Sequence, residues 1–288
     1  MEHDDDAVAD AEDVVDLAGQ VRDITVSGLP EGYDYKATRY ADVVLKEAFP
    51  NRFRDLTNAL EQFEPTLDEL RSGGGNKTPF VDRFDSSLAE QLENDRIIWG
   101  KQNITIQKHL GFDGKLDPAS SVRGHEIDMF GLGSFQQPLP GIAVEMEWNN
   151  KDPFFDRDLI NFQALHHEGA IALGVIVTRG PDLQELLSTV FKQSGSQSKY
   201  SASTTHWKKL IPRVNLGGGG ECPLLLIGIR PERIQGIELA YRVRKKLDEA
   251  EELRTTWRET YESWDEAKPV IDEIRNQAYK IMPPVSEK

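Results

Sequence analysis

The chain has 288 residues, with 34 Lys and Arg residues against 49 Asp and Glu residues and a formal net charge of -15. A hydrophobic fraction of 38% and a charged fraction of 29% are typical of a soluble globular protein with a buried core. The longest apolar stretch, residues 170–177, is too short to span a bilayer, so we expect no membrane partner. A single cysteine, Cys222, excludes a disulfide framework and a cysteine-based zinc site. We therefore expect a cytoplasmic protein in which Cys222 is a small core residue.

The negative charge is distributed unevenly along the chain. Residues 1–18 contain eight acidic residues and no Lys or Arg, and we expect residues 1–22 to form a solvated acidic tail. Residues 186–220 contain five Lys or Arg residues and no acidic residue, a local net charge of +5. Since the local field decides what binds at a surface, the overall acidity does not exclude a nucleic-acid partner.

The first part of the chain is predicted to be mostly helical. Apolar residues recur at helical spacing over residues 35–72, and Pro50 interrupts that pattern. A glycine run at residues 73–76 predicts a flexible break. A shorter helix is predicted over residues 86–95.

From residue 125 onward the pattern alternates between strands and helices. Short apolar runs predict strands at residues 125–130, 142–148, 170–178 and 223–229. Amphipathic spacing predicts helices at residues 156–168, 183–191 and 232–258, whereas residues 193–221 show no regular period. This alternation indicates the α/β fold class, with a central mixed β-sheet flanked by helices.

Acidic side chains gather on one face of the strand predicted over residues 142–148. Side chains alternate between the two faces of a strand, so Glu145 and Glu147 point to the same side. If residues 125–130 pair with this strand as a hairpin, Asp128 joins them and three carboxylates converge. The other face is an apolar set formed by Ile142, Val144, Met146 and Trp148.

Three carboxylates at one spot repel each other unless a cation lies among them. A hard divalent ion with oxygen ligands removes that repulsion, and Mg²⁺ leaves positions free for water and a substrate phosphate. Mn²⁺ prefers similar ligands and is expected to substitute. Such an ion predicts metal-assisted phosphodiester hydrolysis. The alternative is a solvated strand face with ordinary exposed carboxylates.

The order of these motifs resembles the BglII/BstYI group of type II restriction endonucleases, which belongs to the PD-(D/E)XK nuclease class. The resemblance covers about residues 35–235, and the shared order of the short motifs carries it. The resembling segments are residues 103–108, Glu126-Ile127-Asp128, Val144-Glu145-Met146-Glu147-Trp148, the helix from Phe155, residues 175–180, and residues 203–213 followed by Gly217–Gly220 and Cys222-Pro223.

The resemblance implies a restriction-endonuclease-like core and roles for several residues. Asp128 and Glu145 are expected to bind the metal, with the Met146 carbonyl as a further ligand. Asn103 matches an active-site asparagine of BglII-like enzymes, although a cap of a helix or loop is an equal alternative. Glu147 stands where the wider class has lysine, BglII-like enzymes have glutamine and BamHI has glutamate. It is therefore expected either to act as a base or to orient the attacking water.

Two stretches are candidates for binding DNA, which requires cations for the phosphates and polar groups for the base edges. The resemblance implies that the loop after residues 142–148 reaches the major groove, where asparagine can bond adenine, although Asn-Asn also favours a simple turn. Residues 186–220, which contain no acidic residue, are expected to contact DNA, and the alternative is a flexible linker. The candidate residues are Asn149, Asn150, Lys151, Ser198, Lys199, Ser201, Thr204, Thr205, His206, Lys208, Lys209 and Arg213.

The carboxylate pattern, together with what the family resemblance implies, predicts a Mg²⁺-dependent, sequence-specific endodeoxyribonuclease of the type II restriction kind. It would cut double-stranded DNA at a short palindromic site, leave 5′-phosphate ends and act as a homodimer, since two active sites must cut two antiparallel strands. A cognate DNA methyltransferase is expected in the same system, without a stable complex. The alternatives are a repair or junction-resolving nuclease of the same fold and a non-catalytic DNA-binding protein. The predicted parts are an acidic tail (1–22), an N-terminal helical part of the core (23–124), a catalytic and DNA-recognition core (125–235) and a C-terminal helical segment (236–288).

Overall fold

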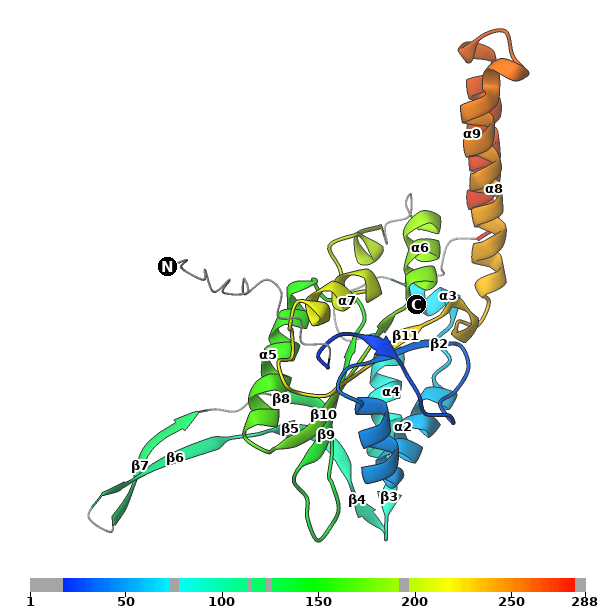
Figure 1. Ribbon diagram of the computed structural model, residues 1–288. Coiled ribbons are helices and arrows are strands. Elements are labelled where there is room, and N and C mark those ends of the chain that lie inside the picture. The colour runs from blue at the N-terminus through cyan, green and yellow to red at the C-terminus, as the bar shows by residue number, and fades with distance from the viewer. Residues whose placement is uncertain (1–17, 73–77, 113–114, 123–125, 192–196, 283–288) are drawn as a thin grey trace, which may run out of the picture.

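The computed structural model describes residues 18–72, 78–112, 115–122, 126–191 and 197–282. A central sheet lies between groups of helices, and a pair of strands and a pair of helices extend away from this body (Figure 1). Most of the acidic tail, the glycine run at residues 73–76 and His125 lie outside the described residues. Among helices in the described ranges, none combines the length and apolar character needed to cross a bilayer.

The central sheet is seven-stranded and mixed. Its middle strands β9, β10 and β11 run parallel, whereas β8, β5 and β2 join it in antiparallel pairs. This arrangement confirms the predicted α/β class with a mixed sheet flanked by helices. In order across the sheet the strands are β1 (Arg22–Asp23), β2 (Tyr33–Ala37), β11 (Leu224–Ile229), β10 (Ile171–Arg179), β9 (Gly141–Glu147), β8 (Glu126–Gly131) and β5 (Trp99–Asn103).

Helices cover both faces of the sheet because the middle strands are apolar on both sides. On one face lie α5 (Pro153–His167) and α7 (Trp207–Asn215), which share a buried cluster with Ala143, Ile176 and Leu226 of the sheet. On the other face lie α2 (Pro50–Gln62), α4 (Pro79–Ala89) and α6 (Pro181–Val190), which form the larger cluster. Cys222 is buried in the α5 cluster, which confirms its prediction as a core residue.

The α5 helix approaches the sheet closely at Gly174 of β10. A Cβ atom at this glycine would lie 2.3 Å from Cδ2 of Phe162 on α5, closer than real carbon atoms approach. The glycine therefore sets how close α5 lies to the strands that it covers.

The N-terminal part departs from the helical prediction. Residues 33–37 form strand β2, in which the short sequence Tyr-Asp-Tyr-Lys-Ala pairs with β11. Pro50 begins α2 at its first position, so the change of pattern there marks a helix start. The predicted helix at residues 86–95 is instead the end of α4 followed by a strand. The smaller elements are α1 (Ala41–Val43), a π-helical turn (Val44–Ala48), α3 (Leu67–Arg71), β3 (Leu92–Glu93) and β4 (Arg96–Ile97).

A second difference is α7, which lies inside the stretch predicted to have no regular period. Trp207, Leu210 and Val214 are buried on one side of it, at helical spacing. Pro212 inside the helix and the glycines after it disguise that spacing. A one-turn 3₁₀ helix, Gln197–Tyr200, precedes it.

Two pairs of elements extend away from the body (Figure 1). Strands β6 (Ile106–Phe112) and β7 (Lys115–Val122) form an antiparallel ribbon between β5 and β8 in the chain. Helices α8 (Ile237–Thr256) and α9 (Trp264–Lys280) form an antiparallel pair. Trp257 and Tyr261 pack against a small buried cluster of this pair, whereas Trp264 is 40% exposed. Short 3₁₀ turns at Pro231–Arg233 and Trp257–Glu259 complete the described elements.

Candidate active site

Strand β9 presents two glutamates to the space beneath α5. Glu145 and Glu147 are buried on the α5 side, next to Ala143 of the same face. The alternate residues Ile142, Val144, Met146 and Trp148 belong to the core on the opposite side. The alternation predicted for this strand is therefore confirmed.

Asp128 adjoins Glu145 from the neighbouring strand β8. The last backbone pair between the two strands joins Met129 to Val144, so Asp128 is the next residue and lies opposite Glu145. The backbone N–H of Asp128 donates a hydrogen bond of 3.2 Å to Oε1 of Glu145. Asp128 is half-buried, whereas both glutamates are buried.

A third buried carboxylate comes from α5. Asp158 is 1% exposed, and one of its carboxylate oxygens lies within 4.8 Å of one oxygen each from Glu145 and Glu147. We call these three residues the carboxylate cluster; Asp128 borders it. Asp158 escaped the sequence prediction, although a signal existed. It falls at helical spacing from the buried Phe155 and Phe162, where an apolar residue would be expected.

The pKa values in the cluster reflect its burial. Burial raises the pKa of Glu145 well above its usual range, and the nearby Asp128 and Asp158 carboxylates raise it further. Burial and the Asp158 carboxylate raise the pKa of Glu147 to about 8. Burial also raises the pKa of Asp158. The site therefore favours a positive charge or retained protons.

Two neighbouring side chains compensate part of the negative charge. The half-exposed Arg157 donates to Asp158 from Nε and from a terminal nitrogen, at 2.8 and 2.7 Å, and its guanidinium lies 3.4 Å from Glu147. Asn150 donates to Oε2 of Glu147 at 2.6 Å. Among the residues that the structure describes, one oxygen of Asp158, Oδ2, is buried without a hydrogen-bond partner. An unpartnered buried carboxylate oxygen among acidic oxygens matches the donor set of a hard divalent cation.

The backbone at the end of β9 bears on the expected Met146 ligand. The Glu147 carbonyl accepts a 2.7 Å hydrogen bond from Oγ1 of Thr178 on β10. Since successive carbonyls of a strand point to opposite edges, the Met146 carbonyl points toward the β8 edge. Pairing with β8 has already ended at Val144, two residues before Met146. The Met146 side chain itself is buried in the opposite core.

Asn103 lies at the end of β5, paired through its backbone with Glu126 of β8. It is exposed, and no described contact joins its side chain to the carboxylate cluster. Its proposed role stays a prediction.

The residues predicted to contact DNA separate into exposed and buried groups. Asn150, Lys151 and Lys208 are exposed. Lys209 and Arg213 are half-buried and form ion pairs with acids at the start of α5, the shortest at 2.8 Å between Arg213 and Asp156.

Several other candidates are engaged inside the protein. Thr204, Thr205 and His206 are buried, and burial together with Arg179 lowers the pKa of His206 to about 4. Lys199 donates to the Ser72 carbonyl. The remaining members are Asn149 and Ser201, both half-buried, and Ser198, whose side chain lies outside the described residues.

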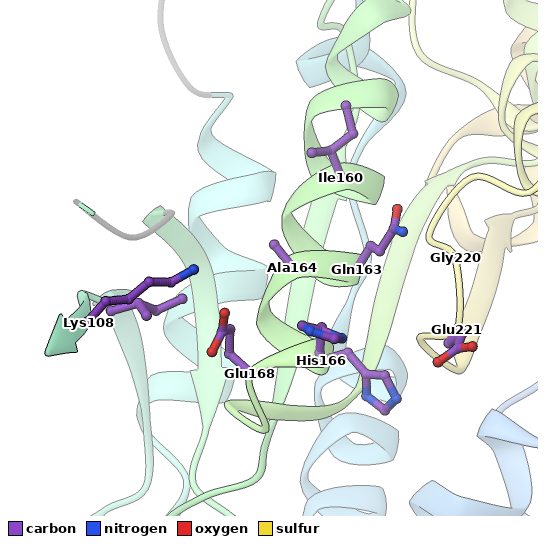
Figure 2. Close-up of a pocket in the computed structure, with 10 residues that line it drawn as sticks. Lys108, Ile160, Gln163, Ala164, His166, Glu168, Gly220 and Glu221 are labelled. Atoms are coloured by element: carbon purple, nitrogen blue, oxygen red, sulfur yellow. The ribbon is translucent and has the colours of Figure 1, made fainter. Parts of the chain in front are cut away.

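A separate hollow of about 670 Å³ lies along the outer side of α5, away from the cluster. Figure 2 shows Ile160 and Gln163 of α5 on its wall, with Lys108 and Glu168 at one side and Glu221 at the other. His166 lies at the end of α5, where its Nδ1 is 3.0 Å from the Ile171 carbonyl. Within the described ranges, the residues of this hollow do not form a group of three metal-binding side chains, so the carboxylate cluster is the candidate site.

Comparison with known proteins agrees with this geometry. The family model described as restriction endonuclease BglII/BglIII matches residues 33–229, about two thirds of the chain. The chain belongs to this restriction endonuclease family. None of the curated proteins compared matches it. The matched region contains six of the seven sheet strands, all but β1, together with Asp128, the carboxylate cluster and α7. The family membership confirms the resemblance noted in the sequence and a restriction-endonuclease-like fold.

Proposed function

We propose that this chain is a Mg²⁺-dependent type II restriction endonuclease. In this proposal it cuts double-stranded DNA at a short palindromic site and leaves 5′-phosphate and 3′-hydroxyl ends. The observation that carries the proposal is the convergence of Glu145, Glu147 and Asp158 beside Asp128, within a segment that matches a restriction endonuclease family. Buried carboxylates that lie together destabilise a fold unless cations or protons neutralise them.

Asp128, Glu145 and the Met146 carbonyl are the proposed metal ligands, and Asp158 offers a further oxygen. When bound, Mg²⁺ polarises a phosphoryl oxygen and lowers the pKa of a coordinated water. Mn²⁺ is expected to substitute. In the metal-free protein, burial and the Asp158 carboxylate raise the pKa of Glu147 to about 8. Beside a bound cation Glu147 would be a carboxylate, which can accept a proton from the attacking water or orient it.

Lys151 and Lys208 are the proposed phosphate contacts, because both are exposed near the end of β9 or at the start of α7. Asn149 and Asn150 follow β9 directly, so that the same short loop leads from the cluster toward the DNA. We further propose that two copies act as a homodimer on a palindromic site. A cytoplasmic location and a cognate DNA methyltransferase remain predictions.

Plasmid digestion tests the proposal. Purified protein is incubated with plasmid in Mg²⁺, in Mn²⁺ and in EDTA, and the products are separated and their ends sequenced. Discrete bands that disappear in EDTA are expected. Random nicking would favour a repair nuclease, and a gel shift without cutting would favour a DNA-binding protein. In a parallel digest of a four-way DNA junction, cutting of the junction but not of the plasmid would favour a junction-resolving nuclease.

A pair of matched variants tests the site. Asp128→Asn should abolish cutting while retaining DNA affinity in Ca²⁺. Glu168→Gln changes an exposed carboxyl at the end of α5 in the same way and should keep full activity. Full activity of Asp128→Asn would remove this residue from the site.

A further inference from the structure

We propose that Arg179 is a positioning residue for the cleavage reaction, because it anchors the segment that holds the Asn150 amide against Glu147. This inference rests on the proposed function, in which Glu147 orients or deprotonates the attacking water. Arg179 ends strand β10 and acts on the site through two hydrogen-bonded stretches of chain.

Arg179 is fully buried. Its guanidinium donates to a hydroxyl and to a backbone carbonyl, both of which are uncharged. One terminal nitrogen donates to Oγ1 of Thr204 at 2.7 Å and to the Thr205 carbonyl at 2.6 Å. The guanidinium lies between two aromatic rings, 5.6 Å from the centre of Trp148 and 5.0 Å from that of Tyr200. In the described part of the chain, burial and the Tyr200 hydroxyl are the influences on the Arg179 charge, and no acidic side chain is among them.

The segment that Arg179 holds lies alongside the loop that follows β9. The backbone N–H of Thr205 donates to the Asn150 carbonyl at 2.8 Å, and Thr204 forms an antiparallel bridge with Lys151. The N–H of Asp152 donates to the Ser203 carbonyl at 3.1 Å. We call these contacts between residues 203–205 and residues 150–152 the seam. The seam fixes the backbone of residues 150–152 from one side.

The seam leads directly to the carboxylate cluster. With its backbone held by Thr205, Asn150 donates from Nδ2 to Oε2 of Glu147 at 2.6 Å. This hydrogen bond from the Asn150 amide orients the Glu147 carboxylate. Its Oε2 accepts from Asn150, and its other oxygen, Oε1, lies 3.4 Å from Arg157. Arg179, Thr205, Asn150 and Glu147 therefore form one continuous chain of contacts.

An arginine suits this position for physical reasons. Burial lowers the pKa of Arg179 to about 9, so the side chain stays charged at neutral pH. A buried charge without an opposite charge destabilises a fold, so stability alone does not account for it. A planar guanidinium holds five N–H donors in a fixed geometry, whereas a lysine offers three on one flexible nitrogen and an apolar residue offers none. The geometry fits an anchor that fixes the loop beside the site.

Amide exchange tests the first link without requiring cleavage. Thr204→Val keeps the shape of the side chain and removes the hydroxyl that accepts from Arg179 and donates to the Ser201 carbonyl at 2.9 Å. We expect exchange of the Thr205 amide, followed by NMR, to accelerate at least about tenfold while core amides of β10 are unchanged. Thr204→Ser keeps the oxygen and should restore slow exchange. Unchanged exchange in Thr204→Val would overturn the proposal, whether or not the protein cleaves DNA.

Kinetics tests the link to Glu147. Thr204→Val should lower kcat about tenfold with KM for DNA within about twofold, since the lost contact acts on positioning rather than on DNA affinity. Asn150→Ala should lower kcat at least as much, and the double variant should match Asn150→Ala alone because both act along one path. Thr189→Val removes a hydroxyl of α6 that bonds the Glu185 carbonyl and Arg244, and should leave kcat unchanged.

The outcomes separate this proposal from the proposed function. Multiplicative effects of Thr204→Val and Asn150→Ala on kcat, or an effect of Thr204→Val on KM alone, would overturn the positioning role. Wild-type protein that fails to cut any DNA in Mg²⁺ would instead refute the nuclease, and the exchange experiment would still decide whether Arg179 anchors the seam.

Discussion

Replacing Glu147 by glutamine should change how the stability of the metal-free protein depends on pH. Burial and Asp158 raise the pKa of Glu147 from 4.5 to about 8 in the folded protein. Below pH 4.5 the folded and unfolded chains both hold this proton, and the stabilisation of the protonated form is fully present. As the pH rises from 4.5 to 8, the unfolded chain releases the proton while the folded chain retains it, so the free energy of unfolding falls.

The size of this loss follows from the pKa difference. About 3.5 pKa units at 1.36 kcal/mol each correspond to about 5 kcal/mol as an upper bound, reached above pH 8. Glutamine at position 147 carries no proton to lose, so the variant lacks this contribution. Glu145 and Asp158 also have raised pKa values, so part of the pH dependence should remain in the variant.

Urea unfolding in EDTA at pH 5 and pH 8.5 measures the effect. The free energy of unfolding of the wild type should fall over this range by about 2–5 kcal/mol more than that of Glu147→Gln. Glu168→Gln removes an exposed carboxyl, and the stability of this variant should depend on pH as that of the wild type does. Mg²⁺ at a hundred times its Kd should then return about 2.7 kcal/mol to the wild type at pH 8.5.

The reasoning would be refuted by either of two results. Parallel pH dependence in the wild type and Glu147→Gln would mean that this carboxyl is not buried as the structure has it. Equal stabilisation of the wild type and of a Glu145→Gln and Asp158→Asn double variant by Mg²⁺ would mean that the ion binds elsewhere.

Three further predictions address the site, the DNA surface and the core. Glu145→Gln should lower the cleavage rate about a thousandfold with DNA affinity retained, since metal polarisation is worth several kcal/mol; single-turnover cleavage and gel shifts measure both. Lys208→Ala should lower the slope of log affinity against log salt by about 0.9, whereas Lys246→Ala, an α8 lysine that pairs with an acid, should leave the slope unchanged. Gly174→Ala should cost about 1–3 kcal/mol of stability in denaturant unfolding because its Cβ would collide with an aromatic ring of α5, whereas Gly100→Ala, with open space around it, should change stability by less than about 0.5 kcal/mol.

Local pattern was enough to place the glutamates. Strict alternation along residues 142–148 fixed which side chains share a face, because the period of a strand is two and a shift by one residue would bury charge in the apolar core. The hairpin with β8 followed from adjacency along the chain, and it brought Asp128 beside Glu145. The short strand β2 was missed because five residues carry too weak a pattern, and its pairing with β11 comes from residues distant in the sequence.

The sequence by itself determined four strands of the sheet, β8 to β11, the carboxylate face of β9 and the family resemblance, since these depend on local apolar runs, on the period of a strand and on the order of short motifs. Tertiary structure alone decided that Asp158 completes the cluster, that Thr204, Thr205 and His206 are buried, and that Arg179 contacts the segment packed on the loop after β9. Their positions depend on how helices and loops pack across the sheet. A long-range packing geometry of that kind has no period in the sequence, so only the folded chain reveals it.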